Sequence, residues 1–192
     1  QEKEFRQIKN SVIQEAERIR FGEITFEDAD LAGHDEPEQM RGESDSCWEL
    51  RQIVRDESLS LADRDEAGKE LERLAERGDT HAQYLMGLLY RAGPLLIPDS
   101  QKAKNWFTQA ADRGLSEAQY ALGKLLLSDD WEVRNPEEGI RWLKESAKNG
   151  NQWAAYRLGK EYLTGEVVTR DTSKAAKWFT QSAEAGNQYA QY

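Results

Sequence analysis

The residues that most often carry catalysis are few in this chain and lie far apart. It has two histidines, His34 and His81, and one cysteine, Cys47. A metal site needs several His, Cys or acidic ligands that converge on one point. The sequence also has neither a Gly-x-x-x-x-Gly-Lys phosphate-binding loop nor a Gly-x-Ser-x-Gly nucleophile motif. The residues therefore predict no enzyme activity, no metal and no cofactor for this chain.

Aromatic and basic side chains recur in a pattern that suits binding. Tyrosines stand 36 residues apart, and the residue four positions after each differs from copy to copy. The pairs are Tyr84 with Leu88, Tyr120 with Lys124, and Tyr156 with Lys160. The constant tyrosines predict packing, whereas the variable position predicts recognition. Aromatic and basic side chains together suit an acidic-aromatic peptide.

The same 36-residue period governs other positions, and a fixed period of this size is typical of stacked helix pairs. The recurring residues are Ala82, Ala118, Ala154 and Ala190; Gly87, Gly123 and Gly159; Trp106, Trp142 and Trp178; and Gly78, Gly114, Gly150 and Gly186. Spacings of three, four and seven place the tryptophans on one helix face. We expect these tryptophans to be largely buried.

Local signals place two helices in each copy. Asp99, Asn135 and Asp171 are good N-caps for the second helix, and Pro136 suits a first helical position. The glycine at the end of each copy is a helix-stop signal. The loop between the helices turns at Gly93 or Gly165, and Asp129 takes that place in the middle copy, where a left-handed conformation is expected.

One diverged copy precedes the three clear ones. Residues 46–81 fit the period, but Arg51 occupies the glycine position, so looser packing is expected there. We predict two regions: residues 1–45 as an N-terminal segment, and 46–192 as the repeats. The repeats are placed at 46–81, 82–117, 118–153 and 154–189, with a further repeat starting at 190, so we expect more repeats beyond the chain.

These motifs resemble the Sel1-like repeat family, a relative of the tetratricopeptide repeats. Residues 154–190 show the pattern most fully, with Leu158-Gly159, Tyr162, Asp171, Ala175 and Trp178. The middle copy departs from it with Leu126, Asp129 and Gly139, which predicts less regular packing there.

The resemblance implies an all-α fold, an α-solenoid wound as a right-handed superhelix, and a protein–protein interaction scaffold without catalysis. By analogy with tetratricopeptide repeats, the first helix of each pair lines a concave, peptide-binding side. The candidate residues on that side are His81, Tyr84, Leu88, Arg91, Glu117, Tyr120, Lys124, Leu127, Trp153, Tyr156, Lys160 and Leu163.

The N-terminal segment has its own pattern. Residues 2–20 predict an amphipathic helix, which either caps the first repeat or contacts another chain. Joined to the repeats, residues 5–36 resemble the C-terminal region of relaxase-type mobilisation proteins of bacterial conjugative elements. That resemblance implies an accessory role in DNA transfer, with the nicking domain outside this chain.

The net charge of the chain bears on the kind of partner that it can bind. The net charge is −10, and residues 21–45 hold nine acidic residues and one arginine. This argues against direct binding of nucleic acid, and no apolar run is long enough to cross a membrane. Residues 33–45 predict an irregular acidic connector, either a solvated tether or a mimic of an acidic ligand.

The single cysteine fits a reducing, cytoplasmic compartment. The oligomeric state stays open.

Overall fold

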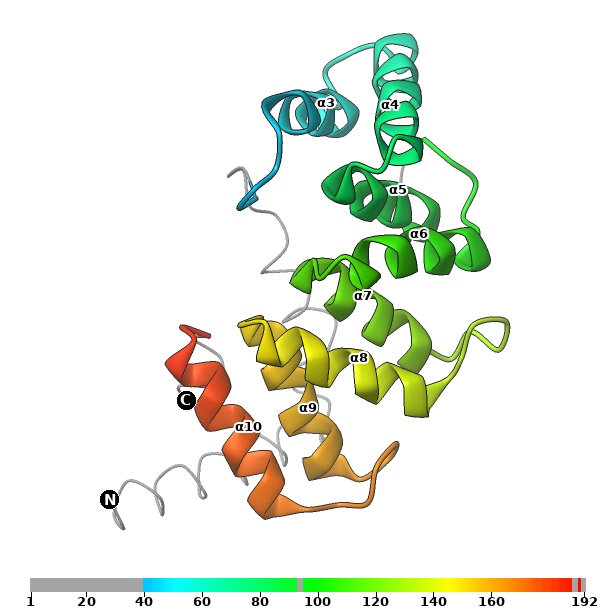
Figure 1. Cartoon of the computed structure of the whole chain (residues 1–192). Helices are drawn as coiled ribbons and strands as arrows, with labels where there is room; N and C mark the ends of the chain where they lie inside the picture. The colour runs from blue at the N-terminus through cyan, green and yellow to red at the C-terminus, as the bar shows by residue number, and fades with distance from the viewer. Residues whose placement is uncertain (1–39, 93–94, 188–189, 191–192) are drawn as a thin grey trace. The chain divides into compact units, whose positions relative to one another are not determined.

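The computed structural model describes residues 40–92, 95–187 and 190, and this part of the chain is helical throughout (Figure 1). It holds eight helices and no strand, which confirms the all-α prediction. The helices are α3 (Asp45–Arg55), α4 (Leu61–Glu76), α5 (Thr80–Ala92), α6 (Ser100–Asp112), α7 (Ser116–Leu127), α8 (Pro136–Lys148), α9 (Gln152–Thr164) and α10 (Thr172–Glu184).

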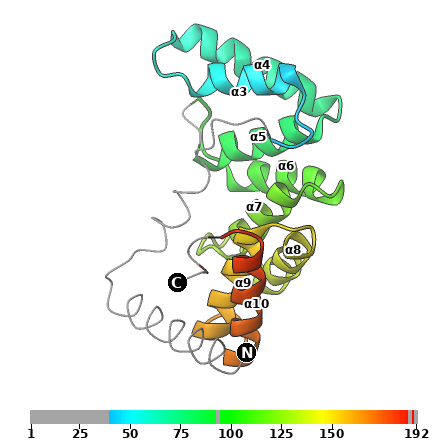
Figure 2. The same cartoon turned by 90° about the vertical axis from the view of Figure 1, so that its left-hand side faces the viewer.

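The chain divides into two compact parts, which are described separately. One part carries α3 to α8 and ends at Asn149. Within it each helix packs against the next one along the chain (Figure 2). The other part carries α9 and α10, which pack against each other. Neighbours in sequence are thus neighbours in space, as expected for helix pairs joined by short connections.

The predicted caps form in every clear repeat. The side chains of Asp99, Asn135 and Asp171 accept hydrogen bonds from the backbone three residues later, and Pro136 opens α8. Each cap residue also donates its own backbone N–H, at 2.8 Å, to a carbonyl near the end of the preceding helix. The acceptors are Tyr90, Leu126 and Tyr162. The two bonds together fix where the second helix starts relative to the first.

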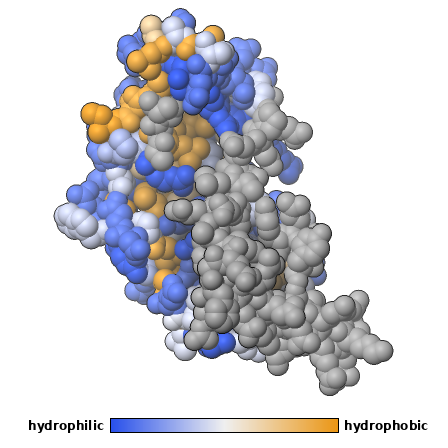
Figure 3. Space-filling view, turned by 180° about the vertical axis from the view of Figure 1, so that it is seen from behind, coloured by the Kyte–Doolittle hydropathy of each residue, from blue (hydrophilic) through white to orange (hydrophobic). Residues whose placement is uncertain are grey.

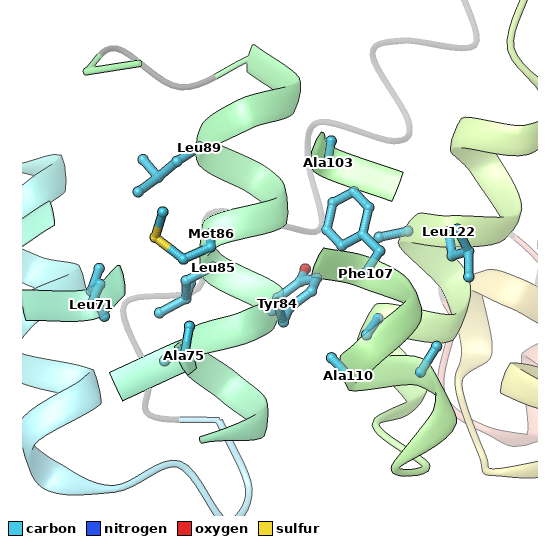
Figure 4. Close-up of a cluster of buried hydrophobic side chains, with 14 of the residues drawn as sticks. Leu71, Ala75, Tyr84, Leu85, Met86, Leu89, Ala103, Phe107, Ala110 and Leu122 are labelled. Atoms are coloured by element: carbon cyan, nitrogen blue, oxygen red, sulfur yellow. The ribbon is translucent and has the colours of Figure 1, made fainter. Parts of the chain in front are cut away.

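The glycine of each first helix makes room for the second helix. A Cβ added to Gly87 would lie 2.4 Å from the ring of Phe107, and one added to Gly159 would lie 2.7 Å from the ring of Phe179. Both rings are buried. Figure 4 shows Phe107 pointing from α6 toward α5, beside Tyr84. The glycine is therefore required by close approach, which offsets its cost of about 1 kcal/mol inside a helix.

α5 buries a second face against the preceding pair. Its apolar side chains on that face point toward Leu71 of α4 (Figure 4). They are Leu85, Met86 and Leu89. Buried glutamines join the pairs as well: Gln83 donates to the Ala75 carbonyl and Gln119 donates to the Ala111 carbonyl, both at 3.1 Å. The pairs α5–α6 and α7–α8 are thus each attached to the preceding pair by a buried hydrogen bond, and α5 also by apolar contact.

The middle repeat is closely packed, contrary to the expectation of less regular packing. A Cβ on Gly139 would lie 3.0 Å from the Gly123 carbonyl oxygen, so the backbones of α7 and α8 come very close. Leu143 takes the place of the phenylalanine and is fully buried. The middle repeat thus has glycine, glycine and leucine at the positions where the other two clear repeats have glycine, alanine and phenylalanine. The smaller residues let the two helices come closer, which compensates for the departure from the pattern.

Two further expectations need correction. Asp129 is not left-handed, because none of the described residues other than glycine has a positive φ, whereas Gly165 does, at 77°. The loop before Pro136 turns through hydrogen bonds and not through an αL residue. Trp106, Trp142 and Trp178 pack against the cores but stay partly exposed. The fully buried position is the next residue along the helix, because that residue faces the glycine.

Arg51 does not loosen the diverged first repeat. Its guanidinium bonds the Glu43 carboxylate at 2.9 Å, and both side chains are buried. Glu43 also accepts from the Met40 backbone N–H. Glu43 is therefore packed in the structure and Met40 is partly buried, whereas residues 41, 42 and 44 are exposed, so the prediction of a wholly solvated connector is wrong at Glu43 and Met40. Residues 33–39 and the predicted helix at 2–20 lie outside the described residues.

The glycine contact gives a matched pair of substitutions. We expect Gly87→Ala to destabilise the chain by about 1–3 kcal/mol, because the new methyl group overlaps a ring that has no room to move. Gly68→Ala is the control, since a Cβ there would meet Leu95 at an ordinary 3.5 Å. Gly68→Ala should stabilise α4 by up to about 1 kcal/mol. Urea unfolding measures both, and equal effects would rule out the close approach.

Cys47 gives a second prediction. Burial, followed by the nearby carboxylates of Asp79 and Glu43, raises the pKa of its thiol to about 12. We therefore expect a thiol reagent at pH 8 to label Cys47 only as fast as the chain opens, since the thiolate is the reactive form. Labelling of the unfolded chain in denaturant is the control. Equally fast labelling of the folded chain would mean that the thiol is accessible.

Candidate peptide-binding face

The candidate residues on α5 and α7 share an electrostatic environment. Burial, followed by the Glu117 carboxylate, raises the pKa of the Tyr84 phenol to about 12, while Arg91, Arg51 and Arg55 oppose the shift. Charged groups of α3, α5 and α7 therefore lie near enough to this buried phenol to affect its pKa.

Tyrosine and lysine form a stacked pair on α7. The Lys124 ammonium lies 5.5 Å from the centroid of the Tyr120 ring, within the range of a cation–π contact. The two residues are four apart, so the helix itself sets this geometry. Tyr120 is buried and Lys124 is partly exposed. The ring thus holds the ammonium in place on the helix face.

The equivalent pair recurs on α9. The Lys160 ammonium lies 5.2 Å from the Tyr156 ring centroid, and Tyr156 in turn meets Phe179 of α10 edge to face, with centroids 5.5 Å apart. Here the lysine is buried as well. On α5 the same position carries Leu88, which is partly buried against the core. The tyrosine is thus the same in all three repeats, whereas the residue four positions later is leucine in one repeat and lysine in two.

Other candidate residues make structural contacts. Leu127 is buried, and its side chain lies 3.0 Å from where a Cβ on Gly139 would be, so it packs between α7 and α8. Leu163 occupies the corresponding position of α9 and is buried. His81 is partly buried next to Gly42, with its Cε1 3.7 Å from the Cβ position. Trp153 is partly exposed near the start of α9.

The face seen in Figure 3 has a mixed character, with hydrophobic residues next to hydrophilic ones. In the described part of the chain, no group of three or more His, Cys, Asp or Glu residues could hold a metal ion. No helix in that part is long and apolar enough to span a membrane. Among the candidate residues the tyrosines are buried, whereas Leu88 and Lys124 are partly exposed and Arg91 is exposed. Peptide binding at this face stays a prediction.

Several solved structures are similar to this chain. One is c5321, a protective antigen of uropathogenic Escherichia coli strains with an SLR fold, at 28% identity and a TM-score of 0.59; the match covers 73% of this chain and 34% of the antigen. Another is a Sel1 repeat protein from Oxalobacter formigenes, at 25% identity and a TM-score of 0.56, covering 62% of this chain and 90% of that one. The chain thus spans about a third of the length of the first of these relatives.

Cysteine-rich protein B of Helicobacter pylori is similar in fold alone. Its identity is 16% and its TM-score is 0.52, with 65% of this chain and 94% of that chain covered. The comparison with curated proteins found no match.

The family model of the Sel1 repeat matches residues 80–115, 116–151 and 154–187. These are the residues that carry the glycine–aromatic contacts, the caps and the tyrosine–lysine pairs described above. The chain therefore belongs to the Sel1 repeat family.

Proposed function

We propose that this chain is a scaffold that binds another protein through the first helices of its repeats and has no catalysis of its own. Sel1 repeats are typical of protein–protein interaction scaffolds. The observation that carries the proposal is the partly exposed Lys124, which is held over the buried Tyr120 ring on α7. A preorganised cation loses little entropy on binding, so it contributes more to affinity than a mobile one.

The chemistry of this face favours an acidic-aromatic peptide as the partner. Lys124 and Arg91 attract carboxylates, while the partly buried Leu88 suits aromatic side chains. The net charge of −10 argues for a protein partner and against nucleic acid. A reducing, cytoplasmic location is part of the proposal, supported by the single cysteine.

The accessory role in DNA transfer stays a prediction. The segment that carries the resemblance to mobilisation proteins, residues 5–36, lies outside the described residues. The acidic-mimic hypothesis now rests on fewer residues, because Glu43 bonds Arg51 and Asp45 begins α3.

The binding proposal is tested by charge reversal. We expect Lys124→Glu to weaken binding of a fluorescent peptide of glutamate, phenylalanine and glycine by at least about tenfold. Lys148→Glu is the matched control, because Lys148 lies on the second helix α8, is well exposed and pairs only locally with Glu145. Fluorescence polarisation at low ionic strength measures both, since screening would mask the difference at high salt.

Equal affinity of the two variants would contradict the proposal, as would equal binding of a peptide in which lysine replaces glutamate. Circular dichroism of Lys124→Glu serves as the folding control. A variant that stays folded and loses affinity separates recognition from the alternative in which Lys124 only stabilises α7.

A further inference from the structure

The loop between α7 and α8 exposes a large aromatic side chain. Trp131 has 83% of its surface open to solvent, the most of any tryptophan in the described residues. The repeat does not require an aromatic residue there, because the equivalent positions one repeat away hold Leu95 and Val167. Both of those are partly buried. Trp131 therefore does not follow from the packing of the repeat.

The loop that carries Trp131 is firmly held. The Asp130 carbonyl accepts from the backbone N–H groups of Val133 and Arg134, and the Asp130 carboxylate accepts from the Glu132 N–H at 3.1 Å. The side chain of Val133 is buried, with 3% of its surface exposed. One side of the turn is thus anchored in the core while Trp131 projects from the other side. An aromatic residue fixed in this way is preorganised for binding.

Acidic side chains surround the indole in sequence. Asp129, Asp130 and Glu132 flank Trp131, and the Asp129 side chain is fully exposed. The one base in the loop, Arg134, is occupied, because its guanidinium donates to the carbonyls of Leu127 and Ser128 and contacts Asp129. Because Asp129 pairs with Arg134, the uncompensated charges around the indole are the carboxylates of Asp130 and Glu132, and both are negative.

The preceding connection adds an apolar residue on the same edge. Each of these loops joins the first to the second helix of a pair, so the loop after α5 and the loop after α7 emerge on one edge of this part (Figure 1). Ile97, in the first of these loops, is 87% exposed.

We propose that the loop at 128–135 is a second docking site, which binds a basic peptide segment of a partner protein. A lysine or arginine of the partner stacks on the Trp131 indole, and the carboxylates of Asp130 and Glu132 pair with its neighbouring bases. Tryptophan gives the strongest cation–π contact of the aromatic residues and is enriched among residues that dominate binding energy. This site has the opposite charge to the tyrosine–lysine face, so the proposal does not rest on the proposed function.

The indole signals of the full chain in a nitrogen–proton NMR spectrum test this site. The chain has six tryptophans, and the signal missing from Trp131→Phe identifies Trp131. A short peptide of lysine, leucine and glycine should shift that signal saturably. A matched peptide with glutamate in place of lysine should leave it unchanged. Trp131→Ala, followed through the backbone signals of the loop, should weaken the basic peptide by at least about tenfold.

Two further variants separate the contributions. Glu132→Lys keeps the indole and the backbone bond to Asp130 but reverses a charge, so it should also weaken the basic peptide by about tenfold. Leu61→Ala removes another exposed apolar side chain, on α4, and should leave the affinity unchanged.

Three results would overturn the proposal. The first is an unshifted Trp131 signal at about 1 mM basic peptide. The second is equal binding of the acidic peptide. The third is a Trp131 signal whose position changes with protein concentration and not with peptide concentration, which would make the occupant a second copy of the chain. Loss of acidic-peptide binding at Lys124 leaves this test unaffected, so the two proposals fail separately.

Discussion

Close approach of two helices at a glycine is the contact on which the rest of the fold depends. A phenylalanine ring, or a leucine in the middle repeat, occupies the place of the missing Cβ at Gly87, Gly123 and Gly159. Because the ring fills that space, the second helix is fixed in distance and in rotation against the first. The caps at Asp99, Asn135 and Asp171 then fix its start, and the loop bonds at 2.8 Å repeat with the same geometry. One small contact thus defines a pair that can be stacked.

Stacking separates the surfaces of each first helix. One face of α5 is used by α6 through Gly87, and another is used by α4 through Met86 and its neighbours. The tyrosine of this helix is one of its packed residues, because the Tyr84 ring lies beside the Phe107 ring with centroids 6.0 Å apart. The residue one turn later is less constrained, and there the repeats differ. The residue type at this position can therefore vary without disturbing the glycine contact.

The sequence predicted what depends on local chemistry. N-caps, a helix-opening proline and glycine stops act within a few residues, so Asp171, Pro136 and Gly114 could be assigned from spacing alone. The sequence could not predict which residue of an apolar stripe is the most deeply buried. Trp106 and Phe107 are adjacent on α6, and only the position of Gly87 on the opposite helix decides that the phenylalanine is central.

Arg51 shows the other limit, because a break in a repeat can be compensated from outside the repeat. Its partner, Glu43, comes from the segment before α3 and is buried with it. Taken by itself, a charged residue in the position of the helix glycine predicts looser packing. The buried Arg51 guanidinium instead bonds the Glu43 carboxylate, which also accepts from the Met40 backbone N–H. No spacing rule identifies that pairing, because the acid lies before the copy it completes.

The same helix, α7, contributes to two surfaces of opposite charge. Lys124 lies on the helix over Tyr120, while the acidic turn with Trp131 follows its end. In the two proposals Lys124 attracts carboxylates and the turn with Trp131 attracts bases, so the two surfaces favour peptide segments of opposite charge. The surfaces are built from different structural parts, a helix face and a loop. A substitution in the loop leaves the glycine contact of α7 intact, so the two surfaces can change independently. The proposed scaffold requires this independence if it joins two different proteins.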